Sequence, residues 1–175
     1  MKLLPVILLL ALLVGCSNTN NPVVPSSGYY KGEVAVFMKD SVSLNNLADY
    51  LANENNISIG RINSFQYYSS LPVDSIQTIL SVLDSKLYIQ NATADTVSIN
   101  GQTRILTEFW VNNFKNEYRS DWELLKTRFQ MRHNPYYKQL GVLKVEEGKE
   151  KIWIDKLIAS NLFRIVELNY IVHVD

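Results

Sequence analysis

The sequence predicts an α+β domain in which two β-α-β halves are separated by an inserted α/β subdomain. In residues 33–68, and again in residues 141–174, an apolar run, a short helical pattern and a second apolar run follow one another. The apolar residues of each helical pattern lie three and four positions apart, so each helix can bury one face against its strands. Together the halves give the order β-α-β-β-α-β, which is that of the ferredoxin-like plait.

The first half begins with a buried strand at residues 33–39, and Asp40, Ser41 and Ser43 then supply turn and N-cap side chains. The apolar positions of the following helix are Leu44, Leu47, Ala48 and Leu51. Residues 53–56 end this helix. The alternating run 57–68 predicts the second strand, with Gly60 as a candidate β-bulge.

Residues 69–140 form the insert, and it opens with a helix. Pro72 is well placed at a helix start, and the apolar stripe behind it consists of Val73, Ile76, Ile79, Leu80 and Leu83. Short strands are expected at residues 87–90 and 96–99. Asn100-Gly101 then predicts a tight hairpin into a strand at residues 103–111, because both turn residues tolerate positive φ.

The second helix of the insert is predicted by a capping box, in which Ser120 and Glu123 satisfy first-turn amides reciprocally. We expect this helix to run to Met131, and Asn134-Pro135 to stop it. Because the insert has elements of its own, we interpret it as an inserted subdomain or cover and not as a linker.

The last third of the chain begins with a strand at residues 142–145 and a turn at Glu146-Glu147-Gly148. The helix that follows carries Trp153, Ile154, Leu157 and Ile158, which we expect on one buried side. A run rich in β-branched and aromatic residues then predicts the final strand.

The N-terminus is typical of a bacterial lipoprotein signal. Lys2 precedes an apolar stretch over residues 3–13, and Leu13-Val14-Gly15-Cys16 resembles a lipobox. The apolar stretch is shorter than the ~20 residues that span a bilayer. We therefore expect residues 1–15 to be a signal peptide, Cys16 to be lipidated, and residues 16–30 to include a flexible tether before a domain at residues 31–175.

This signal places the domain on a bacterial membrane. Ser17 follows the lipidated residue, which by analogy with enteric bacteria favours the outer membrane, on its periplasmic or surface side. The chain contains a single cysteine, so no intramolecular disulfide is possible. The 17 basic and 17 acidic residues balance, and without a basic excess or stripe we exclude nucleic acid as a partner.

No pattern of catalytic residues is present in the sequence. The histidines are His133 and His173, and the cysteine is expected to be acylated, so a nucleophile with an adjacent base is not indicated. His173, on the predicted final strand, has no second ligand at a metal-site spacing. The acidic pairs Glu146-Glu147 and Asp121/Glu123 fit turns and helix starts better than two-carboxylate chemistry. We expect a protein that is not an enzyme and binds no metal or cofactor.

Two further groups of side chains have alternative interpretations. Tyrosine pairs at residues 29–30, 67–68 and 136–137 could stack on sugars or anchor an interface, or could be ordinary sheet and rim residues. Lys126, Arg128 and Arg132 could meet anionic lipid or glycan, or could form a solvated helix face.

The last third also resembles the inhibitory propeptide of subtilisin-like serine proteases, whose closing segment reads V-x-x-G-x-E-x-x-W, then L, then V-x-x-x-E-P-N. The matching positions are Val145, Gly148, Glu150, Trp153, Leu157, Ile165, Glu167, Asn169 and Tyr170. Leu168 stands where the family has proline. The resemblance implies a ferredoxin-like fold whose outer sheet face docks on a protease, while the segment after the last strand enters the substrate cleft. Here that segment is Tyr170, Ile171, Val172, His173, Val174 and Asp175.

The resulting hypothesis is a membrane-anchored lipoprotein that binds and inhibits, or assists the folding of, a subtilisin-like protease encoded elsewhere. The alternative is a non-catalytic periplasmic or surface module that binds another protein or a glycan through the insert, for which Trp110 and Trp122 are candidate residues. The sequence leaves the oligomeric state open.

Overall fold

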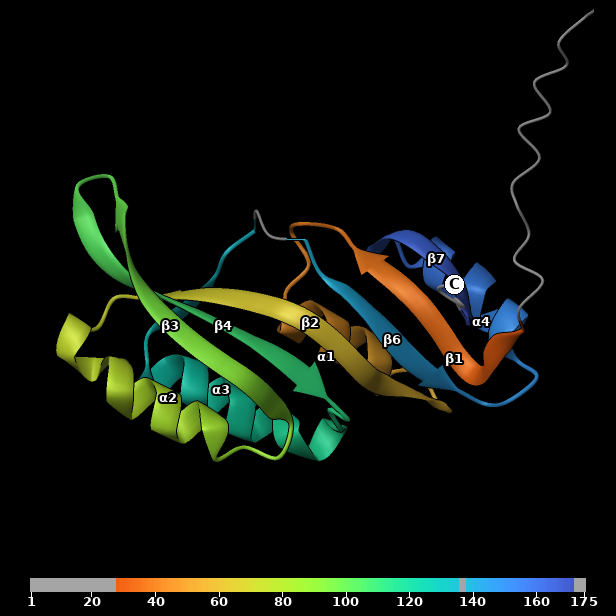
Figure 1. Ribbon diagram of the computed structural model, residues 1–175. Helices are drawn as coiled ribbons and strands as arrows, with labels where there is room; N and C mark the ends of the chain where they lie inside the picture. The colour runs from red at the N-terminus through yellow and green to blue at the C-terminus, as the bar shows by residue number, and fades with distance from the viewer. Residues whose placement is uncertain (1–27, 136–137, 172–175) are drawn as a thin grey trace, which may run out of the picture.

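Seven antiparallel strands form one twisted sheet with four α-helices (Figure 1) in the computed structural model, which describes residues 28–135 and 138–171. The strands are β1 (Tyr29–Met38), β2 (Ile57–Ser69), β3 (Ile89–Ile99), β4 (Gln102–Asn112), β5 (Met131–His133), β6 (Leu140–Val145) and β7 (Phe163–Tyr170). The helices are α1 (Leu44–Ala52), α2 (Ile76–Asp84), α3 (Arg119–Arg128) and α4 (Glu150–Ala159), with short 3-10 turns at Val73–Ser75 and Asn116–Tyr118. The predicted α+β class is confirmed.

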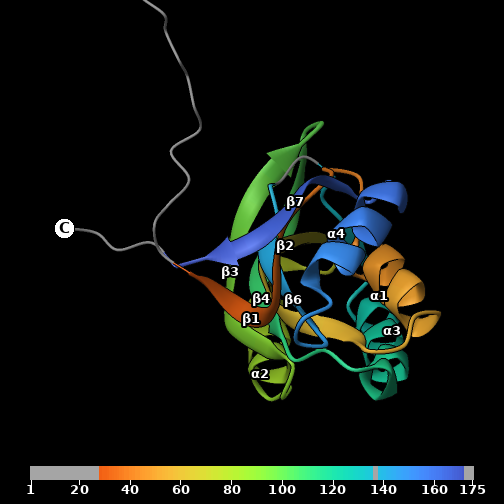
Figure 2. The same cartoon turned by 90° about the vertical axis from the view of Figure 1, so that its right-hand side faces the viewer.

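The strand order is β3-β4-β2-β6-β1-β7, and β5 pairs with the far end of β2. Helices α1, α3 and α4 lie together on one side of the sheet (Figure 2). The opposite face of β1, β2, β6 and β7 is not covered by any helix among the described residues. We call this uncovered surface the open face.

The long strand β2 belongs to two successive β-α-β-β-α-β runs. Its first part pairs with β6, so β1-α1-β2 and β6-α4-β7 give the strand order β7-β1-β6-β2. Its last part pairs with β5, and β2-α2-β3 with β4-α3-β5 gives the order β3-β4-β2-β5. The insert is therefore not a separate cover, because it extends the same sheet and shares β2 with the terminal halves.

The first half follows its sequence signals closely. Ser43 caps α1 through a capping box with Asn46, as its N-cap position predicts. The pairing of β2 with β6 shifts register between Ile59 and Arg61, which confirms Gly60 as the site of an irregularity. Strand β1 begins at Tyr29, so two residues expected in the tether belong to the sheet.

The insert agrees with the sequence at its hairpin and differs elsewhere. Asn100 and Gly101 both have positive φ, and Ile99 pairs with Gln102 across them, as predicted. The two short strands expected at 87–90 and 96–99 are one strand, β3, with a register shift after Gln90. An edge strand can contain such an irregularity and continue beyond it. The polar residues between the two apolar runs therefore do not terminate β3.

The predicted capping box of α3 is wrong. The helix begins at Arg119, directly after the 3-10 turn, and no side chain caps its first turn. It ends at Arg128 instead of Met131, because Gln130 adopts a left-handed conformation and turns the chain into β5.

An aromatic cluster forms the centre of the core where the two runs meet. The ring of Tyr67 stacks on Phe109 with centroids 5.8 Å apart and meets Trp122 edge-on at 5.1 Å. Trp122 also donates its indole N–H to the side chain of Asn45 at 3.0 Å, which joins α3 to α1. These contacts fix the position of α3 relative to α1 and to strands β2 and β4, because buried aromatic pairs have preferred geometries.

Candidate functional site

Glu150 organises the segment that carries the propeptide resemblance. Glu150 is only 2% exposed. Its carboxylate accepts a hydrogen bond from the backbone N–H of Gly32 at 2.6 Å and another from that of Gly148 at 3.1 Å. Both glycines have positive φ, a conformation that other residues adopt at a cost. The hydrogen bond from Gly32 is the main reason that the pKa of Glu150 is lowered.

The matching positions divide into internal and exposed groups. Trp153 and Leu157 are buried against the sheet, as expected. Ile158, expected on the same buried side, is 59% exposed, because a residue five positions after Trp153 has turned away from its side of the helix. Ile165 and Glu167 of β7 are also exposed. Part of the motif therefore builds the β6-α4 turn and the core beneath α4, and another part lies on accessible surface.

Strand β7 is an edge of the sheet and leads into the predicted protease-binding segment. Tyr170 pairs with Tyr29, the first residue of β1, and is 38% exposed. The backbone N–H of Ile171 donates to the carbonyl of Gly28 at 3.0 Å. The remaining predicted residues, Val172, His173, Val174 and Asp175, lie outside the described residues. The segment thus starts beside the first described residue of the chain.

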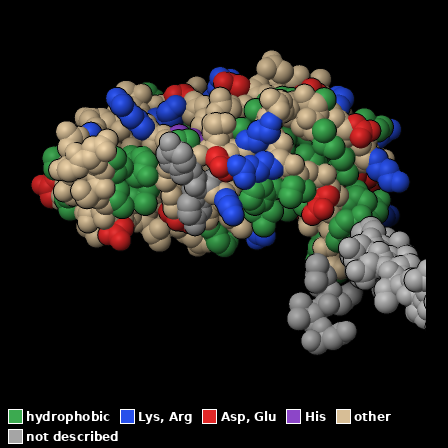
Figure 3. Space-filling model, turned by 90° about the horizontal axis from the view of Figure 1, so that it is seen from above, with side chains coloured by type: hydrophobic (Ala, Val, Ile, Leu, Met, Phe, Trp, Pro, Cys, Tyr) green, Lys and Arg blue, Asp and Glu red, His purple; other side chains and the backbone are tan. Residues whose placement is uncertain are grey.

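An apolar row crosses the open face next to this edge. Phe37 on β1 pairs with Ile165 of β7 on one side and with Leu140 of β6 on the other. Ile165 and Leu140 are each 54% exposed, and Phe37 is partly buried. In the view from above, which looks along the sheet and not onto the open face, hydrophobic and charged side chains are interspersed (Figure 3). The sequence did not predict the row, because its residues come from three separate strands.

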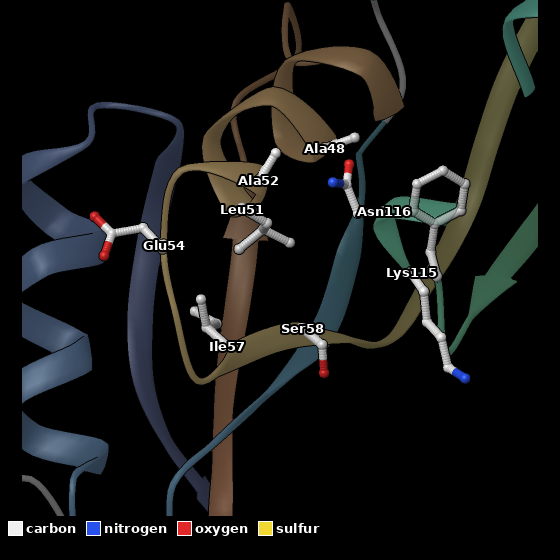
Figure 4. Close-up of a pocket in the computed structure, with 9 residues that line it drawn as sticks. Ala48, Leu51, Ala52, Glu54, Ile57, Ser58, Lys115 and Asn116 are labelled. Carbon is white, nitrogen blue, oxygen red and sulfur yellow. The ribbon is translucent and has the colours of Figure 1, made fainter. Parts of the chain in front are cut away.

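A small pocket of about 270 Å³ lies between the end of α1, the start of β2 and residues 114–116. Its apolar lining is Ala48, Leu51, Ala52, Ile57 and Phe114. Leu51 and Ile57 point toward each other across it (Figure 4). Glu54, Ser58, Lys115 and Asn116 supply polar groups at its rim. Such a pocket can take an apolar group held by a few polar contacts.

Among the described residues, the ionisable groups lie apart or in local ion pairs. His133 lies on β5, with its Nε2 atom 3.2 Å from the side-chain nitrogen of Gln139, and burial lowers its pKa. His173 lies outside the described residues. The described part of the chain holds no group of three or more His, Cys, Asp or Glu side chains suited to a metal ion. Asp121 binds Lys86 and Tyr88, whereas Glu123 binds Lys126.

The two tryptophans considered for the insert have different environments. Trp122 is fully buried in the aromatic cluster. Trp110 is partly exposed on β4, where the Arg61 guanidinium lies 5.9 Å from its ring centroid. Only Trp110 is therefore available to a partner.

The residues predicted to attach the protein to a membrane, 1–15 and Cys16, lie outside the described residues. Within residues 28–135 and 138–171, none of the helices is both long and apolar enough to cross a bilayer. Comparison with protein-family models, with curated proteins and with solved structures finds no match to this chain.

Proposed function

We propose that this chain is a membrane-anchored lipoprotein that binds a subtilisin-like serine protease and inhibits it or assists its folding. The protease would dock on the open face, and the segment Tyr170–Asp175 would add to its substrate cleft as an extended strand. The terminal run β1-α1-β2-β6-α4-β7 is proposed to be a ferredoxin-like plait. Its support is the antiparallel order β7-β1-β6-β2 with α1 and α4 on one side.

The observation that carries the proposal is the apolar row of Ile165, Phe37 and Leu140, whose two outer members are exposed. Exposed apolar residues that cross three strands form a continuous contact surface, whereas single ones need no explanation. The row lies on the same terminal strands as the predicted cleft-binding segment. Because the insert extends the sheet sideways, it leaves this surface open.

The test is inhibition of a panel of bacterial subtilisin-like proteases by the full chain in detergent, with a chromogenic peptide substrate. We expect inhibition that is lost on deletion of residues 170–175 and weakened by Ile165→Lys or Leu140→Lys, because a buried lysine without a partner is costly. Leu124→Lys is the matched control, since Leu124 is 70% exposed on α3, away from the open face.

Two results would contradict this function. One is a folded chain that neither binds nor inhibits any protease of the panel. The other is an equal effect of Leu124→Lys and Ile165→Lys, which would show that added charge, and not the open face, matters.

Membrane attachment is proposed to depend on acylation of Cys16, with the domain on the periplasmic or surface side of the outer membrane. We expect Cys16→Ser to move the chain from the membrane fraction to the soluble fraction of bacterial cells. Persistence of the variant in the membrane fraction would argue against this anchor.

A second candidate function, binding of another protein, is favoured by the pocket between α1 and residues 114–116. Its apolar walls and polar rim suit one apolar side chain of a partner. Ala52 is exposed at its mouth. We expect Ala52→Trp to fill the pocket and block such a partner while leaving protease inhibition unchanged. Loss of inhibition in this variant would mean that the pocket belongs to the protease-binding function.

A further inference from the structure

A second surface lies around Tyr68 at the far end of β2, where β2 pairs with the insert strands β4 and β5. Tyr67 points into the core and Tyr68 to the opposite side, because side chains alternate along a strand. Tyr68 pairs with Leu106 of β4 on one side and with Arg132 of β5 on the other. Arg104 lies two residues along β4 from Leu106 and shares its face.

These residues enclose a hollow of about 230 Å³. It is lined by Tyr68, Ser69, Ser70, Ile99, Arg104, Gln130 and Arg132, and none of these residues is acidic. Arg104 donates to Gln102 at 2.6 Å. The side chain of Arg132 is exposed and makes no hydrogen bond or ion pair within residues 28–135 and 138–171. The hollow therefore presents guanidinium groups from two strands beside one aromatic ring.

The local structure explains why these groups meet. The left-handed conformation of Gln130 reverses the chain after α3 and delivers Arg132 onto the edge of β2. The Ser69 hydroxyl donates to the carbonyl of Phe129 at 2.6 Å, which fixes the turn against β2. The Ser70 hydroxyl donates to the side chain of Gln130. These two hydrogen bonds hold the segments that carry Ser70, Gln130 and Arg132 in place beside β2.

A second hollow of about 440 Å³ shares Ser70, Gln130 and Arg132 with the first and continues toward α3. It adds Lys126, Thr127 and Met131, together with Glu123, which is paired with Lys126 at 3.1 Å. The two hollows adjoin through these shared residues, and we call the pair of them, from Arg104 to Lys126, the basic groove. Two adjoining hollows with cations in each suit a chain of linked units better than a single small ion.

We propose that the basic groove binds an acidic oligosaccharide, one that carries carboxylate or sulfate groups on its sugar rings. Arginine guanidinium groups bind such anions bidentately. The ring of Tyr68 offers an apolar face for the C–H side of a sugar, while Ser70 and Gln130 can exchange hydrogen bonds with its hydroxyl groups. This site is distinct from the apolar row and from the pocket beside α1.

The experiment is isothermal titration calorimetry of the full chain in detergent at low salt. The probes are tetragalacturonate and a heparin tetrasaccharide, with neutral cellotetraose, inorganic sulfate and phosphatidylglycerol vesicles as comparisons. We expect at least one acidic tetrasaccharide to bind with a Kd below about 1 mM, more tightly than every comparison probe.

Substitutions test whether the groove is the site. Arg132→Gln and Arg104→Gln should each weaken binding about tenfold, because each removes a charge-assisted contact. Tyr68→Leu should weaken it several-fold. Arg128→Gln is the matched control, since Arg128 is an exposed cation on α3 that lines neither hollow. Thermal unfolding of each variant checks its fold, and both arginine variants alter partly or fully exposed side chains.

Several outcomes would overturn the proposal. They are absence of binding by both acidic tetrasaccharides, equal binding of cellotetraose or sulfate, and an equal effect of Arg128→Gln and Arg132→Gln. Binding of the vesicles without the tetrasaccharides would assign the groove to a lipid surface instead. Protease inhibition is measured on the same variants, and it should be unchanged, so the two functions fail independently.

Discussion

The carboxylate of Glu150 and the backbone N–H of Gly32 are joined by a hydrogen bond of 2.6 Å across 118 residues of chain. This contact ties the start of α4 to β1 and thereby connects the two terminal halves. The glutamate of the propeptide-like motif therefore holds two backbone segments together, a role that the motif by itself does not indicate.

Glu150→Gln should remove an acid-dependent part of the stability. The folded-state pKa of Glu150 lies below its ordinary value of 4.5, so the unfolded chain binds the proton first as pH falls. The contribution is present above about pH 4.5 and is lost as pH falls through the folded pKa. Urea unfolding at pH 7 and at lower pH should show reduced stability of the variant at pH 7 and a smaller loss on acidification.

Glu146→Gln is the control for this prediction, since Glu146 is an exposed residue of the same turn. A Glu150→Gln protein as stable as wild type at neutral pH, with the same acid response, would show that the hydrogen bonds to Gly32 and Gly148 contribute nothing.

His133 should make stability depend on pH near neutrality. Burial lowers its folded-state pKa below 6.5, so the unfolded state binds more protons in that window. Stability therefore rises with pH between the folded pKa and about 6.5, and it falls as the pH drops. Urea unfolding across this window should give a smaller slope for His133→Gln than for wild type. Equal slopes would mean that the pKa of the partly buried His133 imidazole is the same in the folded and unfolded chain.

Trp122→Ala and Trp110→Ala should differ sharply. Trp122 is fully buried among Tyr67 and Phe109, so its truncation should lower the free energy of unfolding by about 3–5 kcal/mol. Trp110→Ala removes only a partly exposed contact with Arg61, so it should lower the free energy of unfolding by about 1 kcal/mol or less. Chemical denaturation measures both. Similar losses in the two variants would contradict the partly exposed position of Trp110 on β4.

Gly141→Ala should disrupt the pairing of β2 with β6. An added Cβ would clash with the side chain of Ile62 and the carbonyl of Arg61, so a loss of about 1–3 kcal/mol or more is expected. Gly28→Ala is the control, because nothing lies within 4 Å of its Cβ position, and its effect should stay within about 0.5 kcal/mol. Urea unfolding of the two variants makes the comparison, and a neutral Gly141→Ala would show that the strands can move apart without cost.

Local signals were sufficient for much of the secondary structure. Ser43, Gly60 and Asn100-Gly101 act through their own backbone geometry, so a cap, a strand irregularity and a hairpin could each be predicted at the right place. The start of α3 could not, because Ser120 competes with a preceding 3-10 turn that continues directly into the helix.

The candidate sites depended on tertiary structure to a greater extent. The sequence by itself determined the α+β class, the helix and strand periods and the Gly-x-Glu spacing around Gly148 and Glu150, because these act over a few neighbouring residues. Only the tertiary structure decided that β2 is shared by two β-α-β-β-α-β runs. It also decided that Phe37, Leu140 and Ile165 form one row and that Arg104 and Arg132 flank Tyr68. Strand pairing between distant segments sets these neighbours, and a strand's own pattern of residues specifies which face it buries but not which strand lies beside it.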